Sequence, residues 1–510
     1  MVETAAPRVT LRNYFSHPYD SAIAAARTCY SPTIVSPEEV TDKQRLTIGA
    51  ATFEGGHHTV YQHAHFEFGL ENVSRQFVWS FLHSHPFYNS EQQSQRYVRL
   101  DRAAAYVPPL AGEARAVFEQ QIERAWSHYR ALGELLASDT QALLADIWHL
   151  SEMSHERRRK KVARQAEKKA IEIARYVLPV AAFTNMVHTL SGIVLHRLWR
   201  MQRAGDTPTE ASAVVSAMVA RVKEVDPAFF ERVGKQPLAD EQLPEWAFLQ
   251  QPATNGFRKE LDTQLSGRVS VLADYSANAE RVVAQAVRAV LGRSEAELAD
   301  DAALEAVMNP AKNRYRLETL NVGAHSPLMR ALNHAHYTFA KRISHTADSQ
   351  DQRHRMVPGS RPLLLATDSA APDYVTPMLI RRNPRARELY EQAMAEAWAA
   401  KQRLLELGVS REFALYVLPN AVAVRFHESG SLLHLLHKWT MRTCFNAQEE
   451  IYQASMEEVE QVRRVHPRLM KYVGPPCYVR VGITSPICTE GSHFCGIKVW
   501  ESFPAIDRRI

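Results

Sequence analysis

Cysteine is scarce in this chain, with five among 510 residues. So few thiols in a chain of this length do not make a disulfide framework, and we expect a reducing cytoplasmic compartment. Residues 1–7 lack a basic region followed by an apolar core, so we expect no secretory signal there. No stretch approaches the roughly 18 apolar residues of a membrane span. We therefore expect a cytoplasmic protein without a membrane partner.

A strong charge of one sign is also missing. The net charge of +5 is spread over 510 residues, which is too dilute to predict nucleic-acid binding. A local cluster of arginines would still suffice to bind a small anion such as a nucleotide. Apolar residues at 45% and charged residues at 23% are ordinary values for a globular protein. The length alone predicts two or more domains.

Two parts of the chain repeat one another. Tyr-Val-Leu-Pro at residues 176–179 returns at residues 416–419, and Val-Gly at residues 233–234 returns at residues 473–474. Both matches share an offset of 240 positions (416 minus 176, and 473 minus 233). A repeat of this length is too long for a solenoid and predicts duplicated domains.

The repeat suggests a division of the chain into four parts. We expect a first copy at residues 1–240 and a second copy at residues 261–475, joined by a linker at residues 241–260. Residues 476–510 then form a cysteine-containing C-terminal tail.

Long helical patterns fill much of both copies, and the strand-like segments are short. The predicted helices cover residues 113–138, 142–176, 187–203, 212–225, 386–407 and 431–465. No Gly-rich phosphate loop follows any strand-like segment. The pattern therefore predicts an α+β architecture rather than a parallel βαβ fold.

A basic run at residues 157–161 continues into Arg164, Lys168 and Lys169. Such a run is typical of a solvated helix face. An electrostatic funnel for anionic substrates is the alternative.

Polar motifs differ between the copies. The first copy has Ser74-Arg75 and a dense polar run at residues 91–97, which offers the hydroxyl, guanidinium and backbone NH groups that a phosphate monoester needs. A plain polar surface loop is the alternative. The second copy has Gln350 and then two arginines flanking a histidine at residues 353–355, which suits either an exposed basic turn or an anion site.

Arg442 of the second copy lies among apolar neighbours. A semi-buried arginine in this setting favours a dedicated anionic or carbonyl partner, with an intramolecular salt bridge as the alternative. Ala-Gln-Glu-Glu-Ile follows at residues 447–451.

Together these motifs resemble the flavin-dependent thymidylate synthase family. Its motif is Arg-His-Arg, then Ser, then Asn-Glu-x-Ser-x-Arg-Tyr, with Ile-Ser-Arg and a Gln before it and Leu-Pro, an Arg and Ala-Gln-x-Glu-Ile after it. The second copy matches this pattern at Gln350, residues 353–355, residues 418–419, Arg442 and residues 447–451. The first copy matches it at residues 74–75, 94–97 and 175–179.

The resemblance assigns a role to each matching residue. In the first copy it implies that the nucleotide and its phosphate are held by Glu91, Ser94, Arg96 and Arg175. In the second copy it implies that Gln350 and Arg442 contact and polarise the uracil ring, as the catalytic pair. It places Arg353, His354, Arg355 and Ser431 near the flavin, although Ser431 stands where the family has Asn.

The missing parts of the two copies are complementary. The first copy has His83-Ser84-His85 in place of Arg-His-Arg and Gln202 in place of Arg442. The second copy has Leu415 in place of Arg175 and lacks Ser-x-Arg-Tyr. We therefore expect one hybrid active site per pair of copies and no activity in either copy alone.

The family's known properties set the functional expectation. They imply two tandem copies of a fold with a twisted antiparallel sheet and long helices, forming a pseudo-dimer that pairs with a second chain into a pseudo-tetramer. They also imply an FAD enzyme that methylates dUMP to dTMP with methylenetetrahydrofolate and NADPH. The alternatives are a flavoenzyme for another pyrimidine nucleotide and a catalytically inactive relative that binds nucleotide or flavin.

The tail is not explained by the resemblance. Cys477, Cys488, His493 and Cys495 fall within 19 residues and suit tetrahedral zinc, but no Cys-x-x-Cys pair is present. Buried or free thiols, and a redox pair, are the alternatives.

Overall fold

The computed structural model describes residues 2–96, 98–150, 156–251 and 255–510. Each copy contributes one four-stranded antiparallel sheet, in the order β1-β2-β4-β3 and β5-β6-β8-β7. The first sheet contains β1 Arg8–Tyr14, β2 His65–Ser74, β3 Tyr88–Gln92 and β4 Phe183–Ser191. The second contains β5 Ser270–Tyr275, β6 His336–Ser344, β7 Gly359–Ser360 and β8 Ala423–Ser431. The mixture of helices and antiparallel sheets confirms the α+β prediction.

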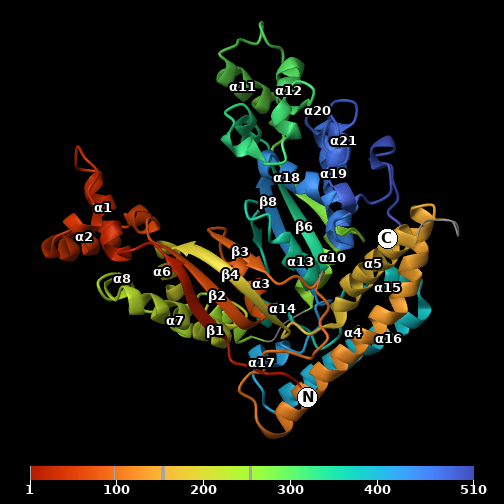
Figure 1. The fold of residues 1–510 in the computed structure, drawn as a ribbon, viewed down its shortest axis with the longest axis horizontal. Coiled ribbons are helices and arrows are strands. Elements are labelled where there is room, and N and C mark those ends of the chain that lie inside the picture. The colour runs from red at the N-terminus through yellow and green to blue at the C-terminus, as the bar shows by residue number, and fades with distance from the viewer. Residues whose placement is uncertain (1, 97, 151–155, 252–254) are drawn as a thin grey trace.

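Helices surround both sheets (Figure 1). Residues 1–265 contain α1 Pro18–Thr28, α2 Asp42–Glu54, α3 Arg75–His83, α4 Gly112–Ile147, α5 Glu156–Ala174, α6 Gly192–Arg200, α7 Pro208–Val225, α8 Ala228–Glu231, α9 Trp246–Leu249 and α10 Gly256–Leu265. Residues 266–510 contain α11 Ala279–Leu291, α12 Asp300–Met308, α13 His345–Asp351, α14 Leu364–Thr367, α15 Met378–Arg382, α16 Pro384–Glu406, α17 Arg411–Leu415, α18 Leu432–Arg442, α19 Glu449–Val465, α20 Pro467–Met470 and α21 Pro476–Arg480. Within the described part of the chain, none of the helices has the length and apolarity to span a membrane.

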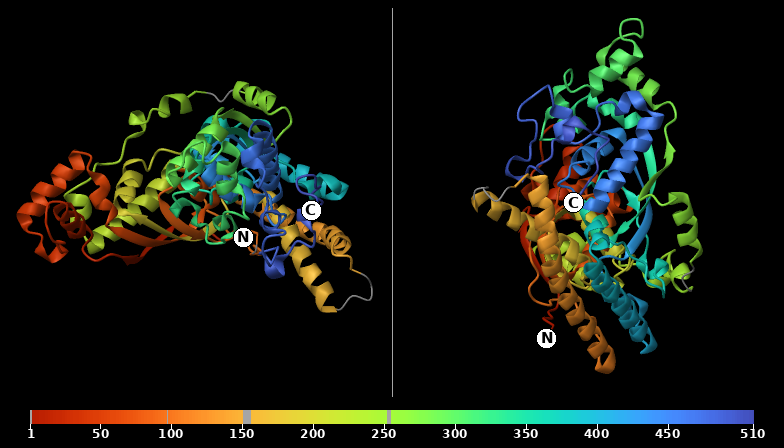
Figure 2. Two further views of the ribbon diagram at one scale, coloured as in Figure 1. Left: turned by 90° about the horizontal axis from the view of Figure 1, so that it is seen from above. Right: turned by 90° about the vertical axis from the view of Figure 1, so that its right-hand side faces the viewer.

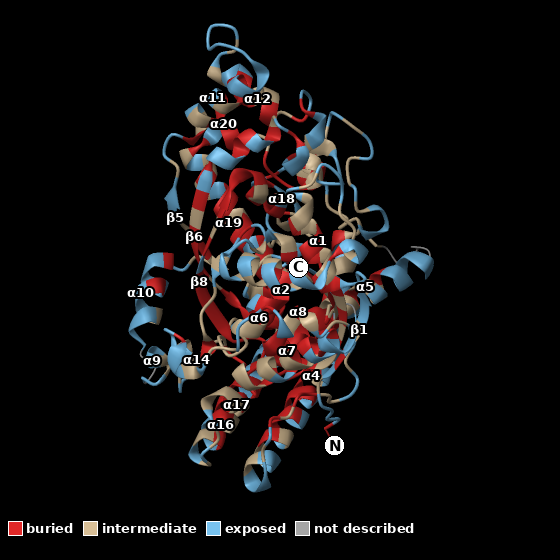
Figure 3. Cartoon of the chain, turned by 90° about the vertical axis from the view of Figure 1, so that its left-hand side faces the viewer, coloured by how far each residue is buried: buried red, intermediate tan, exposed pale blue. Residues whose placement is uncertain are grey.

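Long helices from both copies pack against each other away from the sheets. The 36-residue α4 contacts α5 of its own copy and α16 of the second copy. Figure 2 shows α4 and α16 side by side over much of their length. In contrast, the pairs α1–α2 and α11–α12 project at the far ends of the molecule (Figure 1), and α2 exposes several of its residues (Figure 3).

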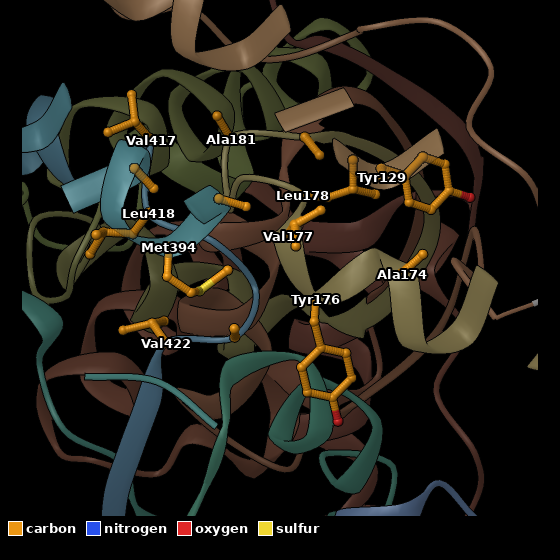
Figure 4. Packing of buried hydrophobic residues seen from close by; sticks show 14 of the residues in the cluster. Tyr129, Ala174, Tyr176, Val177, Leu178, Ala181, Met394, Val417, Leu418 and Val422 are labelled. Atoms are coloured by element: carbon orange, nitrogen blue, oxygen red, sulfur yellow. The ribbon is translucent and has the colours of Figure 1, made fainter. Parts of the chain in front are cut away.

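The two copies share one apolar core. It combines Tyr176 and Leu178 of the first copy with Trp398, Val417 and Leu418 of the second. Figure 4 shows side chains from both copies interleaved in this core. The two repeated Tyr-Val-Leu-Pro segments also meet directly, through an antiparallel bridge between Pro179 and Pro419. Burial of apolar surface therefore stabilises the contact between the copies.

A buried glutamate joins the start of α3 to the second copy. Ser74 caps α3, because its Oγ accepts a hydrogen bond from Phe77 N at 2.8 Å. The Ser74 hydroxyl donates to Glu210 Oε2 at 2.6 Å, and the hydroxyl of Tyr416 donates to the same oxygen at 2.6 Å. The helix that follows β2 is thus held through a tyrosine of the other copy.

The equivalent arrangement of the second copy lies at the start of α13. Ser344 Oγ accepts from Ala347 N at 3.1 Å and donates to Glu450 Oε1 at 2.6 Å. The Tyr176 hydroxyl of the first copy donates to Glu450. Each copy therefore supplies a tyrosine to the helix cap of the other.

Three helix predictions require correction. Residues 187–203 are not one helix, since β4 runs to Ser191 with alternately buried residues and only then does α6 begin. Residues 431–465 form two helices, because a turn at residues 443–448 separates α18 from α19. The predicted helix at residues 142–176 spans the end of α4 and all of α5, and its residues 151–155 lie outside the described part.

The remaining helix predictions are confirmed. They correspond to α4, α7 and α16. Residues 156–161 on α5 are exposed, which agrees with a solvated helix face.

Candidate active site

A cavity of about 600 Å³ is lined by residues of both copies. The lining residues are Arg75, Glu91, Gln92, Gln93, Ser94, Gln95, Arg96, Arg175, Thr346, Ser349, Gln350, Arg353, His354, Asn420, His437, Met441 and Arg442. All the residues that the family resemblance selects are among them except Arg355 and Ser431. The two half-sets of motifs, more than 250 positions apart between Ser94 and Gln350, therefore meet in one place.

Strand β3 and the segment after it bring the first copy's polar residues to the cavity. β3 pairs with β4, with Glu91 opposite Val187. The chain then leaves the sheet, and Ser94 Oγ accepts from Arg96 N at 3.2 Å to form a short side-chain turn. This turn presents Ser94 and Arg96 to the cavity. Tyr97 of the same motif lies outside the described residues.

Three arginines of the first copy converge on the cavity wall. Arg75 donates from Nη2 to Gln93 O at 2.5 Å, and burial together with the charge of Arg175 lowers the pKa of Arg75 to about 9. Arg96 forms an ion pair with Glu172. Burial lowers the pKa of Arg175, and its Nε and Nη2 atoms have no hydrogen-bond partner among the described residues.

Glu172 is the carboxylate that pairs with Arg96. Burial opposes its ionisation, yet Arg96 and Lys169 hold the pKa of Glu172 well below its usual range. Lys169 Nζ lies 3.0 Å from Glu172 Oε1. One carboxylate therefore faces several cations, and the wall carries an excess of positive charge suited to an anion.

Helices α13 and α18 bring the second copy's residues to the opposite wall. Gln350 lies near the end of α13, and its Oε1 is buried without a hydrogen-bond partner among the described residues. Arg442 is the last residue of α18 and donates from Nε to His354 Nε2 at 2.8 Å. Burial and the charge of Arg442 lower the pKa of His354 to about 3. His354 is therefore neutral, and it fixes the orientation of the Arg442 guanidinium.

A second cavity of about 460 Å³ adjoins the first and shares Glu91, Gln92 and Arg353 with it. Arg353 Nη2 lies 2.9 Å from Glu91 Oε2 at an exposed position. Arg355 lines this second cavity, where it donates to Asn89 Oδ1 at 3.2 Å and lies over the ring of Tyr88.

These features fit a bound flavin nucleotide. The guanidinium groups of exposed Arg353 and half-buried Arg355 suit a diphosphate. Gln352 also lines the second cavity, and its buried Oε1 has no donor among the described residues. A ring system with N–H groups would supply one.

Ser431 is not brought to either cavity. Its hydroxyl donates to Asn333 Oδ1 at 2.9 Å and lies 3.1 Å from His434 Nδ1. A role for Ser431 at the flavin stays a prediction.

Several residues of the site were missed by sequence reasoning. Asn420 donates to Gln95 Oε1 at 3.2 Å and to the backbone oxygen of Arg175 at 3.0 Å, which ties the two copies together at the cavity. Glu172 lies one helical turn before Arg175, and that spacing was a usable signal. Asn420 had no such signal, because its partners are far away in the sequence.

Two of the candidate zinc ligands of the tail lie in an apolar setting, and a metal role for the candidates stays a prediction. Among the described residues, no group of three or more His, Cys, Asp or Glu side chains could hold a metal ion. Cys477 and Cys495 instead belong to an apolar cluster with Val499 and Phe503. Burial raises the pKa of the Cys477 thiol to about 11. All five cysteines are free thiols.

Known proteins of one family are similar to this chain. The family model described as thymidylate synthase complementing protein matches residues 10–228 and 271–468. A flavin-dependent thymidylate synthase of Clostridium tetani is 28% identical over 237 residues, which are 46% of this chain and 88% of the relative. Enzymes of the same name are 36% identical over 29% of the chain and 57% of the Saccharolobus solfataricus relative, and 31% identical over 41% of the chain and 77% of the Sulfolobus acidocaldarius relative.

A solved structure is also similar over a little less than half of the chain. It is a UMP/dUMP methylase, PolB from Streptomyces cacaoi, bound with 5-Br dUMP. The match has a TM-score of 0.31 and 18% identity and covers 46% of this chain and 100% of the other. A TM-score this low supports no conclusion about the fold or the function of this chain.

The two family matches cover most of the chain and fall in the two predicted copies. They confirm the resemblance and the expectation of an enzyme of the flavin-dependent thymidylate synthase type. This chain belongs to the thymidylate synthase complementing protein family, with two regions that match it.

Proposed function

We propose that this chain is an FAD-dependent thymidylate synthase-like enzyme with one hybrid site, which converts dUMP to dTMP using methylenetetrahydrofolate and NADPH. The observation that carries the proposal is the buried guanidinium of Arg175. Its Nε and Nη2 have no hydrogen-bond partner among the described residues, and the cavity that it lines is also lined by Gln350 and Arg442 of the other copy. A substrate with a phosphate at one end and a polar ring at the other satisfies both walls.

The phosphate would be held by the first copy. Arg175 and Arg75 repel each other in a buried setting, and a bound dianion would relieve that repulsion. The dianion would also accept hydrogen bonds from Arg175 Nε and Nη2, which have no partner among the described residues. Ser94 and Arg96 lie on the same wall. Nothing in this arrangement requires a nucleophilic cysteine.

The uracil ring would be held by the second copy. Gln350 Oε1 is available to accept a hydrogen bond from a ring N–H. Arg442, oriented by neutral His354, would stabilise the negative charge on a ring carbonyl oxygen in the enolate-like form from which C5 attacks a one-carbon unit. A reduced flavin, when bound, supplies the hydride. Arg353 and Arg355 would hold its phosphates, and the folate and NADPH are proposed from the family.

We further propose that the two copies form the pseudo-dimer of this family and that two chains pair as a pseudo-tetramer. The shared core and the reciprocal contacts of Tyr176 and Tyr416 support the first part. They join each copy's helix cap to the other copy.

The proposal is tested with purified protein and added FAD. We expect flavin absorbance to remain with the protein after gel filtration. With dUMP carrying tritium at C5, methylenetetrahydrofolate and NADPH, we expect tritium release into water. Arg442→Ala should still bind dUMP but release tritium about 100-fold more slowly, which is typical for loss of one oxyanion-stabilising group. The exposed Arg221→Ala, on α7, is the matched control and should behave as wild type.

Each contrary result has a defined meaning. Protein that retains no flavin would overturn the enzyme assignment in favour of an inactive nucleotide-binding relative. Flavin retention without tritium release from dUMP would point to another pyrimidine nucleotide.

A further inference from the structure

The C-terminal tail extends beyond the family-matched region, which ends at residue 468. It packs onto the turn at residues 443–448 between α18 and α19. Phe445 of this turn belongs to an apolar cluster with Val499 and Phe503 of the tail. In Figure 1 the C-terminus lies beside α5, the helix that carries Glu172. The tail is therefore in place to act on the first copy's side of the cavity.

Polar contacts connect the tail to this turn. Asn446 Nδ2 donates to Glu490 Oε2 at 3.0 Å and to His493 O at 3.0 Å. Arg508 donates from Nη2 to Ala447 O at 2.7 Å. The side chain and backbone of the turn are thus held at three points by residues that the family match does not include.

The same turn contacts the phosphate wall. The backbone oxygen of Asn446 accepts from Arg96 Nη2 at 3.0 Å. Arg96 also pairs through Nε with Glu172. A guanidinium that is planar and held at both Nε and Nη2 has a defined orientation. A shift of the turn would therefore rotate Arg96.

The tail also adds charge next to this wall. Arg508 is half-buried, and this burial lowers its pKa, while the nearby charges of Glu172 and Glu449 partly oppose that effect. Arg508 lies over the ring of Tyr452. Arg508 lies near Glu172, so the carboxylate that pairs with Arg96 also interacts with the charge of Arg508.

We infer that the tail is a positioning segment of the phosphate site, in which Glu490 holds Asn446 and Asn446 in turn holds Arg96. The inference rests on the proposed function, because it concerns the group that binds the nucleotide phosphate. Glu490 and Asn446 act through Arg96 and are positioning residues.

A double-mutant cycle on the full-length protein tests the inference. The dUMP dissociation constant is measured by calorimetry for wild type, Asn446→Ala, Arg96→Ala and the double variant. Loss of a side-chain hydrogen bond predicts a weakening of about three- to tenfold for Asn446→Ala in the wild-type background. In the Arg96→Ala background the same change should have an effect below about twofold, since the residue acts through Arg96.

The outcomes separate the possibilities. Equal weakening by Asn446→Ala in both backgrounds would overturn the inference and leave the proposed function standing. Equal dUMP affinity of wild type and Arg96→Ala would overturn the proposed phosphate site, and this inference with it. Glu490→Ala provides the same cycle if Asn446→Ala does not fold. Glu501→Gln, in an exposed tail ion pair with Lys498, is the control and should not change dUMP binding.

Discussion

Arg175 illustrates a conflict between stability and function at a single residue. Its buried Nε and Nη2, which have no hydrogen-bond partner among the residues that the structure describes, destabilise the protein when no ligand is bound. The second copy has Leu415 at the corresponding position, and that side chain is buried in the shared core. An apolar side chain is therefore compatible with this place in the fold.

We expect Arg175→Met to stabilise the protein without nucleotide and to abolish dUMP binding. Removing the unsatisfied charge should raise the free energy of unfolding by about 1–2 kcal/mol. The thermal midpoint without ligand and the dUMP titration measure the two effects. Arg221→Met on the surface of α7 is the matched control. A lower thermal midpoint for Arg175→Met would show that the guanidinium has a stabilising partner.

At the scale of elements, the caps of α3 and α13 help to position side chains of the candidate site. α3 begins with Arg75 and α13 carries Gln350. Both helices start at a serine that donates to a buried glutamate, and each glutamate accepts from a tyrosine of the other copy. The geometry of the site therefore depends on contacts between the copies as well as on each helix.

The Glu210 cap predicts a pH dependence of stability. Burial raises the pKa of Glu210 from 4.5 to about 7, despite hydrogen bonds from Ser74 and Tyr416. The folded protein then binds this proton more tightly than the unfolded chain. The stabilising contribution of Glu210 protonation to the free energy of unfolding is full below pH 4.5. It is lost as the pH rises toward 7, by at most about 1.4 kcal/mol per pH unit.

Glu210→Gln removes this titration. We expect the thermal midpoint of wild type, relative to that of Glu210→Gln, to decrease as the pH is raised from 5 to 7. Calorimetry at several pH values in this window measures the decrease. A difference between the two proteins that stays constant with pH would contradict the raised pKa. Glu224→Gln, an exposed change on the same helix, is the control.

At the scale of the whole molecule, the pseudo-symmetry between the copies is broken at the site. Counted from the capping serines, His345 corresponds to Arg75 and Trp79 corresponds to Ser349. Trp79 is buried and donates to Asp348 Oδ2 at 2.9 Å, and Arg361 lies 2.9 Å from the same carboxylate. Protein side chains therefore occupy the position that is equivalent to the cavity when the two copies are exchanged.

This asymmetry predicts one dUMP per chain. Calorimetric titration of the full-length protein should give a stoichiometry near one nucleotide for each polypeptide, whatever its state of association. Two nucleotides per chain would contradict the hybrid site, because the related place lacks the equivalents of both Arg75 and Arg175.

Much of this protein was predictable from local sequence patterns. The repeat indicated two copies, and eight of the ten residues that the family motifs selected line the cavity, because their residue types carry the chemistry of phosphate and ring recognition. The alternation of buried residues in β4 was misread as a helix, since a short apolar run fits either period. Ser431 was carried over from a motif position, but it lies outside both cavities.

Sequence alone determined which groups each copy kept, because a side chain's chemistry is local. The tertiary structure decided that these groups share one cavity, that Nε and Nη2 of Arg175 have no hydrogen-bond partner among the described residues, and that the tail reaches Arg96 through Asn446. Those facts depend on contacts between residues hundreds of positions apart. Such contacts arise from packing of the shared core, and no local pattern encodes them.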